Sequence, residues 1–555
     1  MQFIRRLFKE DSTPLPAWNR WLIFYAVLLL VAGIRMTWNT EHCLDLFFFD
    51  ETEYLYKGLR LASEQYNSWG PSYNVWYFLL SLIKSNPVEL YYFNFKVIII
   101  LIPILLFFFL YAYEVSIHLS VLFALSYLML NLHTANFTLV SHFCLICILI
   151  GFIAARFAEK NEHKLMALLT AAYICMYARQ EFLIIVAGLL LLWLICVIQQ
   201  RKVYASAWHL CFVIVVAGLY ALFGFITFKG QGIDRSYFAF MQYFYANYIL
   251  WSKKIIPLDQ FNSLDLFKGS KTMFQCMTAN PALFAKHVAT NAMTYGISLY
   301  KYFEDFFLPK SIFHFFGKGK HILFGLLLIA FAYQLVFKRS YRHLTGFIKE
   351  RPLISVAIFL FFGWSFFSIF MIYPNRHYIV LQFCWYLLIL AFLLKNYWKF
   401  FDNKFIQGLL LVLLFVFIPT GKKVSYYQQG MADRDKQPNL RAVQYLIRHD
   451  PHKPVKILSP EKGFYAYLPA NFTELFPVDN DINPYHDNHS FDMQRFITEK
   501  GINVIYMSER MQDLTRISSG NAENDIALHP EKFGFIRIVL DKNLKTFLLV
   551  KNGSF

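Results

Sequence analysis

The stretch "VIIILIPILLFFFLYAY", residues 97–113, contains no charged side chain. A helix of about 20 such residues spans the roughly 30 Å hydrocarbon core of a bilayer. The whole chain of 555 residues is 57% hydrophobic, whereas soluble proteins contain about 45–50% apolar residues. Similar, nearly uncharged runs recur at residues 21–36, 137–155, 182–198, 207–228, 322–337, 353–373, 378–394 and 405–419. We therefore predict a polytopic α-helical membrane protein.

The net charge of +17 is concentrated in short segments between the apolar runs, and the last part of the chain is nearly balanced. The basic segments are residues 5–9, 160–164, 201–202, 338–351 and 395–404. This is the distribution that holds cytoplasmic loops on the inner side of a membrane. We therefore predict membrane lipids, and no nucleic acid, as partners.

With the basic N-terminus inside, the apolar runs predict about eleven spans. These lie near residues 21–36, 93–113, 116–131, 137–157, 165–178, 182–199, 206–228, 321–338, 353–373, 377–394 and 405–420. The threading places residues 38–90 and residues 229–320 on the outer side. The turn near Glu114 has no basic residue, so its side follows from counting alone. We predict a membrane domain, 1–420, followed by an outer α/β domain, 421–555.

The tail after residue 420 has the composition of a soluble domain. "NLRAVQYLIRHD" (439–450) predicts an amphipathic helix, and "PVKILSP" (454–460) predicts a strand. "FDMQRFITEKGINVIYMS" (491–508) predicts a helix, a glycine stop and a buried strand. "FGFIRIVLDKNLKTFLLVKN" (533–552) predicts a hairpin. In the outer segment, "NPALFAKHVATNAMTYGISLYKYFEDFF" (280–307) predicts a helix that lies on the membrane surface.

Acidic residues follow three phenylalanines in "FFFDETEYLYKGL", residues 47–59. Residues 51–66 have the pattern of an amphipathic helix, with Glu53–Lys57 and Arg60–Glu64 as i, i+4 pairs. Asp50 and Glu53 have the spacing of a capping box, which is one explanation for the acids. The other is that Asp50 is a general base for an acceptor hydroxyl or amine.

Cationic side chains stand at predicted outer ends of spans. They are Arg179 in "MYARQEF" and Arg376 with His377 in "MIYPNRHY". Such residues can stabilise a departing phosphate. Alternatively, Arg179 pairs with Glu181, and Arg376 is an interfacial anchor beside Tyr378.

Three segments, in order, resemble the GT-C superfamily of glycosyltransferases that use polyprenyl-phosphate sugars. The segments are "FDETEYLYKGLRL" (49–61), "WGPSYNVWYFLLSLI" (69–83) and "YPNRHYIVLQF" (373–383). The similarity is to the branch of protein mannosyltransferases and lipid A aminoarabinose transferases. It implies a catalytic role for Asp50 with Glu51 as its neighbour.

The same resemblance assigns the donor phosphate to Arg376, Arg179 and His377. Lys57, Tyr73 and Tyr378 are candidate residues of the acceptor cavity. Relatives commonly have an acid in the second outer loop, whereas "NLHTANFTLVSHF" (131–143) has only His133 and His142 as titratable groups. The sequence therefore leaves a divalent metal possible but does not support one, and we predict no other cofactor.

We expect an enzyme that moves a sugar from a polyprenyl-phosphate donor to a lipid, glycan or protein acceptor on the outer face of a bacterial inner membrane. One rival is a glycan polymerase or ligase, for which Arg235 and His287 in the long outer segment would be essential. The other is a transporter, for which repeated halves or charges inside the spans are typical.

Overall fold

The computed structural model is mostly helical, with a small sheet near its C-terminal end. The described residues are 8, 20–48, 50–63, 70–130, 132–133, 139–200, 206–225, 229–230, 233–254, 261, 264–313, 316–337, 339–397, 403–419, 437–449, 454–459, 462–475, 486–487, 490–491, 493–508, 511–512, 525–540 and 546–554.

The chain forms two compact units, and their boundaries do not follow the sequence in simple order. The first unit contains residues 1–38, 65–73 and 96–420. The second contains residues 39–64 and 74–95 together with the tail, 421–555. One break between the units falls after residue 420, and most of residues 38–90 belong to the same unit as the tail.

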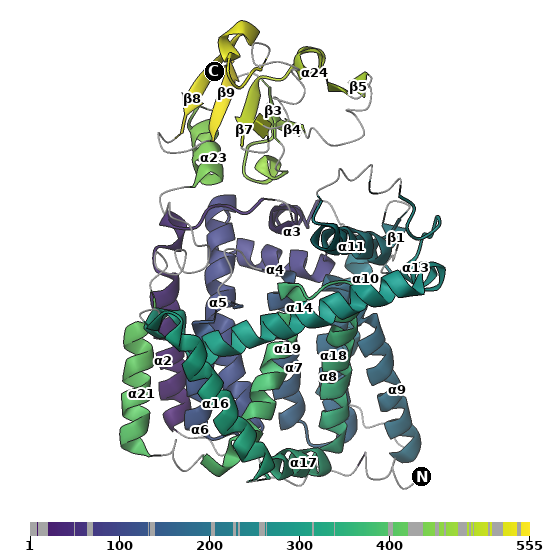
Figure 1. The fold of residues 1–555 in the computed structure, drawn as a ribbon, viewed down its shortest axis with the longest axis vertical. Coiled ribbons are helices and arrows are strands. Elements are labelled where there is room, and N and C mark those ends of the chain that lie inside the picture. The colour runs from purple at the N-terminus through teal and green to yellow at the C-terminus, as the bar shows by residue number, and fades with distance from the viewer. Residues whose placement is uncertain are drawn as a thin grey trace. The chain divides into compact units, whose positions relative to one another are not determined.

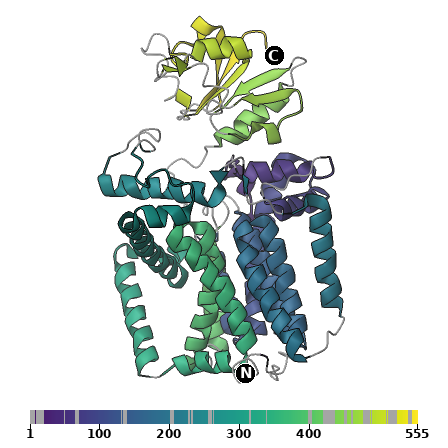
Figure 2. The same cartoon turned by 90° about the vertical axis from the view of Figure 1, so that its right-hand side faces the viewer.

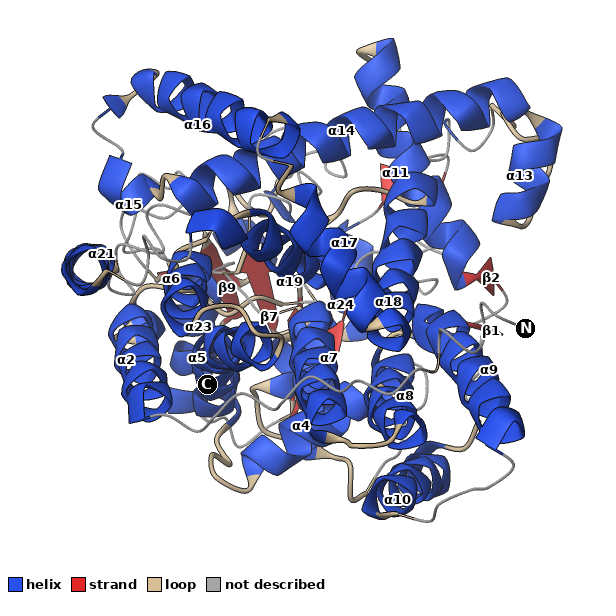
Figure 3. Ribbon diagram, turned by 90° about the horizontal axis from the view of Figure 1, so that it is seen from below, coloured by secondary structure: helices blue, strands red, loops and turns tan. Residues whose placement is uncertain are grey.

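Apolar helices that run side by side make up most of the first unit (Figures 1 and 2). They are α2 (Arg20–Thr37), α5 (Pro87–Ala112, which starts in the second unit), α6 (Ile117–Leu128), α7 (Val140–Phe157), α8 (Asn161–Ala178), α9 (Leu183–Gln200), α10 (Ala207–Phe223), α16 (Gly319–Val336), α18 (Pro352–Met371), α19 (Arg376–Leu393) and α21 (Lys404–Phe417). Seen from below, α7 and α19 lie toward the middle of this unit, and α2, α9 and α16 lie at its edge (Figure 3). Exposed apolar side chains on the edge helices fit a lipid environment.

The predicted count of about eleven spans is wrong for the described residues. Six helices there are long and apolar enough to cross a membrane: α2, α5, α7, α9, α16 and α18. Three shorter apolar stretches of helix, 117–128 in α6, 207–223 in α10 and 378–393 in α19, fall below that length. Apolar runs in the sequence continue into turns beyond the helix ends, so a run of about 20 residues need not be a helix of that length. Helix α8 has the length of a span, but its first turn carries the charged residues Glu162 and Lys164.

An ion cluster of two buried arginines and a partly exposed glutamate joins three turns of the first unit. The Glu114 carboxylate accepts from Arg351 and lies 3.5 Å from Nη2 of Arg156. The Arg156 Nε also donates to the Ala112 carbonyl at 3.0 Å. The turn near Glu114 therefore lies at the same end of this unit as the end of α7 and the start of α18.

The segment 229–320 is largely helical. It contains β1 (Lys229–Gly230), β2 (Ile233–Asp234), α11 (Arg235–Ser252), α13 (Met273–Ala279), α14 (Pro281–Phe307) and α15 (Lys310–Phe313). The helix predicted from 280–307 is α14, which runs across the upright helices (Figure 1). Its buried side, with Phe284 and Tyr295, has the 3–4 residue spacing of an amphipathic helix. Helix α17 (Tyr341–Glu350) follows α16.

The second unit contains the α/β fold predicted for the tail. A five-stranded sheet has the order β4-β3-β7-β9-β8. Its strands are β3 (Val455–Leu458), β4 (Phe472–Leu475), β7 (Val504–Met507), β8 (Phe535–Val539) and β9 (Phe547–Lys551). Both β4 and β7 pair with β3 in parallel, and β8 and β9 form the predicted antiparallel hairpin. The predicted helices are α23 (Pro438–Arg448) and α24 (Met493–Lys500), and β5 (His486–Asp487) pairs with β6 (Ser490–Phe491).

Helices α3 (Asp50–Leu59) and α4 (Pro71–Ser81) precede α5. The helix predicted over 51–66 therefore begins at Asp50 and ends at Leu59. Gly58 explains the close approach of α3 to α4, because a Cβ there would lie 2.4 Å from the Cβ of Tyr77. Beyond the helix end, the guanidinium of Arg60 lies over the ring of Tyr56 at 4.4 Å, and Glu64 lies outside the described residues.

Candidate functional site

The acids at the start of α3 are in different environments. Asp50 is the first residue of the helix and is exposed, whereas Glu51 is only 2% exposed. The Glu51 carboxylate accepts from the Tyr77 hydroxyl and from Nδ2 of Asn94 at 3.1 Å. Asn94 in turn accepts from the indole of Trp76 at 2.7 Å. Of the two acids, Asp50 is therefore the one that a solvent-borne group can approach.

Glu53 and Lys57 form the predicted pair one turn along the same helix, with 3.0 Å between Oε1 and Nζ. Lys57 is 4% exposed, so it lies within the unit and not on its surface. Glu53 also accepts from the hydroxyl of Tyr465, in the tail. Burial acts to raise the pKa of Glu53, but Tyr465 and Lys57 outweigh it and hold this pKa below its ordinary value. Glu53 is therefore a carboxylate at neutral pH.

Arg179 lies between α8 and α9, in the first unit. Its Nε and Nη2 contact Oε1 of Glu181 at 2.6 and 2.5 Å, and its Nη1 donates to Ser141 at 2.8 Å. The guanidinium also lies 4.8 Å from the ring centroid of Tyr378. The pairing with Glu181, considered above as an alternative, is therefore present, and the structure brings Arg179 and Tyr378 together.

Arg376 begins α19, two residues before Tyr378. The side chain is half-buried and forms no hydrogen bond or ion pair with the part of the chain that the structure describes. The preceding turn is fixed by Asn375, which donates to the Tyr243 hydroxyl at 2.7 Å, and by the stacked rings of Tyr243 and Tyr373. The side chain of His377 lies outside the described residues.

His287, on α14, supports this same turn. It is fully buried, and its Nε2 donates to the Ile372 carbonyl at 3.1 Å while Nδ1 contacts Asn247 at 2.9 Å. Burial lowers the pKa of His287 to about 4, so the ring is neutral. A neutral histidine with both nitrogens occupied is a structural residue. The polymerase alternative instead requires His287 to be an essential basic residue, and the side chain of Arg235 lies outside the described residues.

Tyr73 is fully buried, with its ring 5.4 Å from that of Phe143. It is a packing residue of the first unit in this structure. A small cavity does lie next to Tyr378, where Glu181 and the hydroxyl-bearing Ser365 and Ser368 are among its lining residues. This cavity adjoins the Arg179 cluster.

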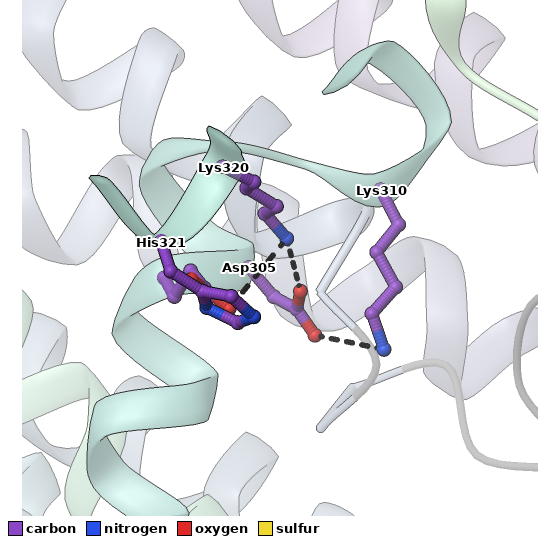
Figure 4. A network of polar contacts seen from close by, with 5 residues as sticks. Asp305, Lys310, Lys320 and His321 are labelled. Carbon is purple, nitrogen blue, oxygen red and sulfur yellow. Dashed lines mark hydrogen bonds and ion pairs between the residues drawn. The ribbon is translucent and has the colours of Figure 1, made fainter. Parts of the chain in front are cut away.

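Another charged cluster, which the sequence did not predict, joins the ends of α14 and α16 (Figure 4). Lys320 and Lys310 approach the two oxygens of Asp305 at 2.7 and 3.6 Å, and His321 contacts Glu304 at 2.5 Å. These acid–base pairs connect α14 with α15 and with α16. Among the residues with described side chains, no three histidine, cysteine or acidic residues gather as a metal site would require.

The candidate residues thus belong to two units. Asp50, Glu51 and Lys57 lie in the second, and the arginines with Tyr73 and Tyr378 lie in the first. Sequence reasoning missed Ser141, and it missed Tyr465 because a residue about 400 positions away has no signal near Glu53. No protein-family model matches this chain, and no curated protein is significantly similar to it. The resemblance described above therefore rests on the three short segments, on their order and on the predicted topology.

Proposed function

We propose that this chain is an integral membrane glycosyltransferase that moves a sugar from a polyprenyl-phosphate donor to a lipid, glycan or protein acceptor. The proposal includes a GT-C-like membrane domain, a bacterial inner membrane, and an active site on the outer face. The apolar helices support the membrane part of it.

The observation that carries the proposal is the pair of guanidinium groups at adjoining helix ends. Arg376 has no ion pair among the described residues, and Arg179 lies against Tyr378, which is two residues farther along α19. Guanidinium groups bind phosphate through two parallel hydrogen bonds, and a departing phosphate needs such stabilisation. The network around His287 and Asn375 keeps the turn before Arg376 in one conformation.

Each candidate side chain has one role in the proposed reaction. Asp50 accepts the proton of the acceptor hydroxyl or amine, whose lone pair forms a bond to the anomeric carbon of the donor sugar. The bond between that carbon and the phosphate oxygen breaks, and its electrons stay on the phosphate. Arg376 and Arg179 neutralise that charge. Glu51, which is buried and hydrogen-bonded, holds α3 against α4 and α5.

A deletion strain complemented with the wild type or with Asp50→Asn tests the assignment. Asn supports a helix N-terminus about as well as Asp but is no base. We expect the variant to lose the glycan product and to accumulate lipid-linked sugar, measured by mass spectrometry of surface glycans and of the polyprenyl-phosphate-sugar pool. Asp265→Asn, at an exposed aspartate of the first unit, is the control and should rescue. If Asp50→Asn rescues fully at normal expression, Asp50 is only a helix residue, and the polymerase and transporter explanations take precedence.

A further inference from the structure

The C-terminal domain is bound to the segment that carries α3 at two places within the second unit. At the first, Asp45 accepts from the backbone N–H groups of Asn439 and Leu440 at 3.1 and 2.9 Å. These are among the first N–H groups of α23, which have no partner inside the helix. Gln437 donates to the carbonyls of Glu41 and Leu44 at 2.9 and 2.6 Å. Asp45 therefore acts as the N-cap of a helix about 400 residues later.

The second place is the short loop before β4. Phe48 packs against Phe464, with 4.9 Å between ring centroids. The loop approaches so closely that a Cβ at Gly463 would lie 2.5 Å from the Phe48 ring. The Glu474 carboxylate accepts from the N–H groups of Gly463 and Tyr465 at 3.0 and 3.2 Å. This arrangement fixes the backbone of Tyr465.

From this loop, Tyr465 reaches α3. Its hydroxyl donates to Glu53, and its ring lies 4.7 Å from that of Tyr56 in an edge-to-face arrangement. Glu53 is one turn after Asp50, on the same helix. Helix α3 has 10 residues, and helices shorter than about 12–15 residues are marginal without partners. The position of α3 therefore depends on what it packs against, and one of those groups comes from the tail.

We propose that the C-terminal domain positions the catalytic helix, and that Tyr465 is the positioning residue which sets the direction of Asp50 through Glu53. The inference rests on the proposed function, because it assigns the domain a part in the transfer reaction. The domain is then a working part of the active site and not a separate binding module.

The test uses the full chain in detergent micelles and the variant Tyr465→Phe, which removes only the hydroxyl. Loss of a hydrogen bond to a charged group raises the equilibrium constant for local opening of a helix about tenfold. We expect the amides of α3 to exchange about tenfold faster, measured by hydrogen–deuterium exchange. We also expect a lower kcat with an unchanged KM for the lipid-linked donor, since the proposed function assigns the donor phosphate to Arg376 and Arg179 and not to Tyr465. In a Glu53→Ala background, Tyr465→Phe should have no further effect.

Tyr341→Phe, which removes a hydroxyl from an exposed tyrosine of the first unit, is the matched control. Unchanged exchange of α3 in Tyr465→Phe would overturn the positioning role, and so would faster exchange with an unchanged kcat. Faster exchange together with a fully active Asp50→Asn would instead refute the proposed function and the catalytic part of the inference, while the contact between the tail and α3 would stand.

Discussion

Arg179 and Arg376 show that one residue type can be in two electrostatic states at the same candidate site. Arg179 is paired with Glu181 at 2.5 Å, whereas Arg376 has no such partner among the described residues. A phosphate that binds to Arg376 meets an uncompensated charge. A phosphate that binds to Arg179 has to compete with a carboxylate. In the proposed function, Glu181 therefore opposes binding of the donor phosphate, and it is among the residues that line the small cavity beside Tyr378.

This competition predicts that Glu181→Gln binds undecaprenyl phosphate more tightly than the wild type. The amide keeps the shape of the side chain but removes the charge that neutralises Arg179. We expect a decrease in Kd of about tenfold, the size of one charge-assisted hydrogen bond. Binding to the purified protein in micelles can be followed by tryptophan fluorescence or calorimetry.

Ser141→Ala is the control for this prediction, because it removes a neutral contact of Arg179 and leaves the ion pair in place. Its Kd should rise or stay constant. If Glu181→Gln weakens binding, Glu181 supports the position of Arg179 more than it blocks it, and the competition argument fails.

At the residue scale, the sequence predicted the charges but not their environments. Asp50 and Glu51 are adjacent and equally acidic, yet one is exposed and the other is buried under Tyr77 and Asn94. That difference arises from the packing of α3 on α4 and α5, and no local pattern in the sequence encodes it. Tyr465 is a stronger case, because its contact with Glu53 joins distant parts of the chain.

Among the secondary-structure elements, the start of α23 is sensitive to a change in pH, because Asp45 accepts hydrogen bonds from its first N–H groups. Burial raises the pKa of Asp45 from its ordinary 3.8 to about 7, against the opposing effect of its N–H donors and Arg441. Between these two values the folded state keeps a proton that the unfolded state releases. The contribution of Asp45 to stability is therefore full below about pH 4 and is lost as the pH rises to about 7.

We predict that the second unit unfolds at a lower temperature at pH 7.5 than at pH 5, and that Asp45→Asn reduces this difference. We expect Asp45→Asn to reduce the difference between the two unfolding midpoints by a few degrees. A change of about 1 kcal/mol in the free energy of unfolding shifts the midpoint by that much in a unit of this size. Scanning calorimetry of the full chain at both pH values measures it. Glu474, whose pKa burial raises to about 8, acts in the same direction, so part of the difference should remain in Asp45→Asn. Parallel curves for the two proteins would contradict the assignment to Asp45.

The sequence predicted the types of elements better than their ends. Helix α24, the glycine stop and β7 appear in the predicted order, because Gly501 has the positive φ of 63° that ends a helix. The spans were overcounted, because hydropathy records apolar residues and not where the helix ends. Strand β4 was missed, since its four residues, Phe472–Leu475, become a strand only by pairing with β3.

At the scale of the whole molecule, the ion cluster of Glu114, Arg156 and Arg351 marks one end of the first unit. Arg179 follows α8, at the opposite end of that helix from the basic turn after α7. Tyr378 lies in the first turn of α19, at the opposite end of that helix from the basic turn after it. If basic turns face the cytoplasm, as is general in membrane proteins, the candidate phosphate site faces outward. The Glu114 turn, whose side the sequence assigned by counting spans alone, belongs with the basic turns.

The outward orientation predicts which positions a membrane-impermeant maleimide reaches in intact cells. Lys271→Cys, in the segment 229–320, and Lys532→Cys, in the tail, should react, because both positions are exposed and are predicted to lie outside. Lys349→Cys, on α17 and two residues before Arg351, should react only after permeabilisation. The unsubstituted chain, with its own eight cysteines, gives the background. Labelling of Lys349→Cys in intact cells, with protection of the other two positions, would reverse the orientation. It would move the phosphate site to the cytoplasmic face and make a donor on the outer leaflet impossible.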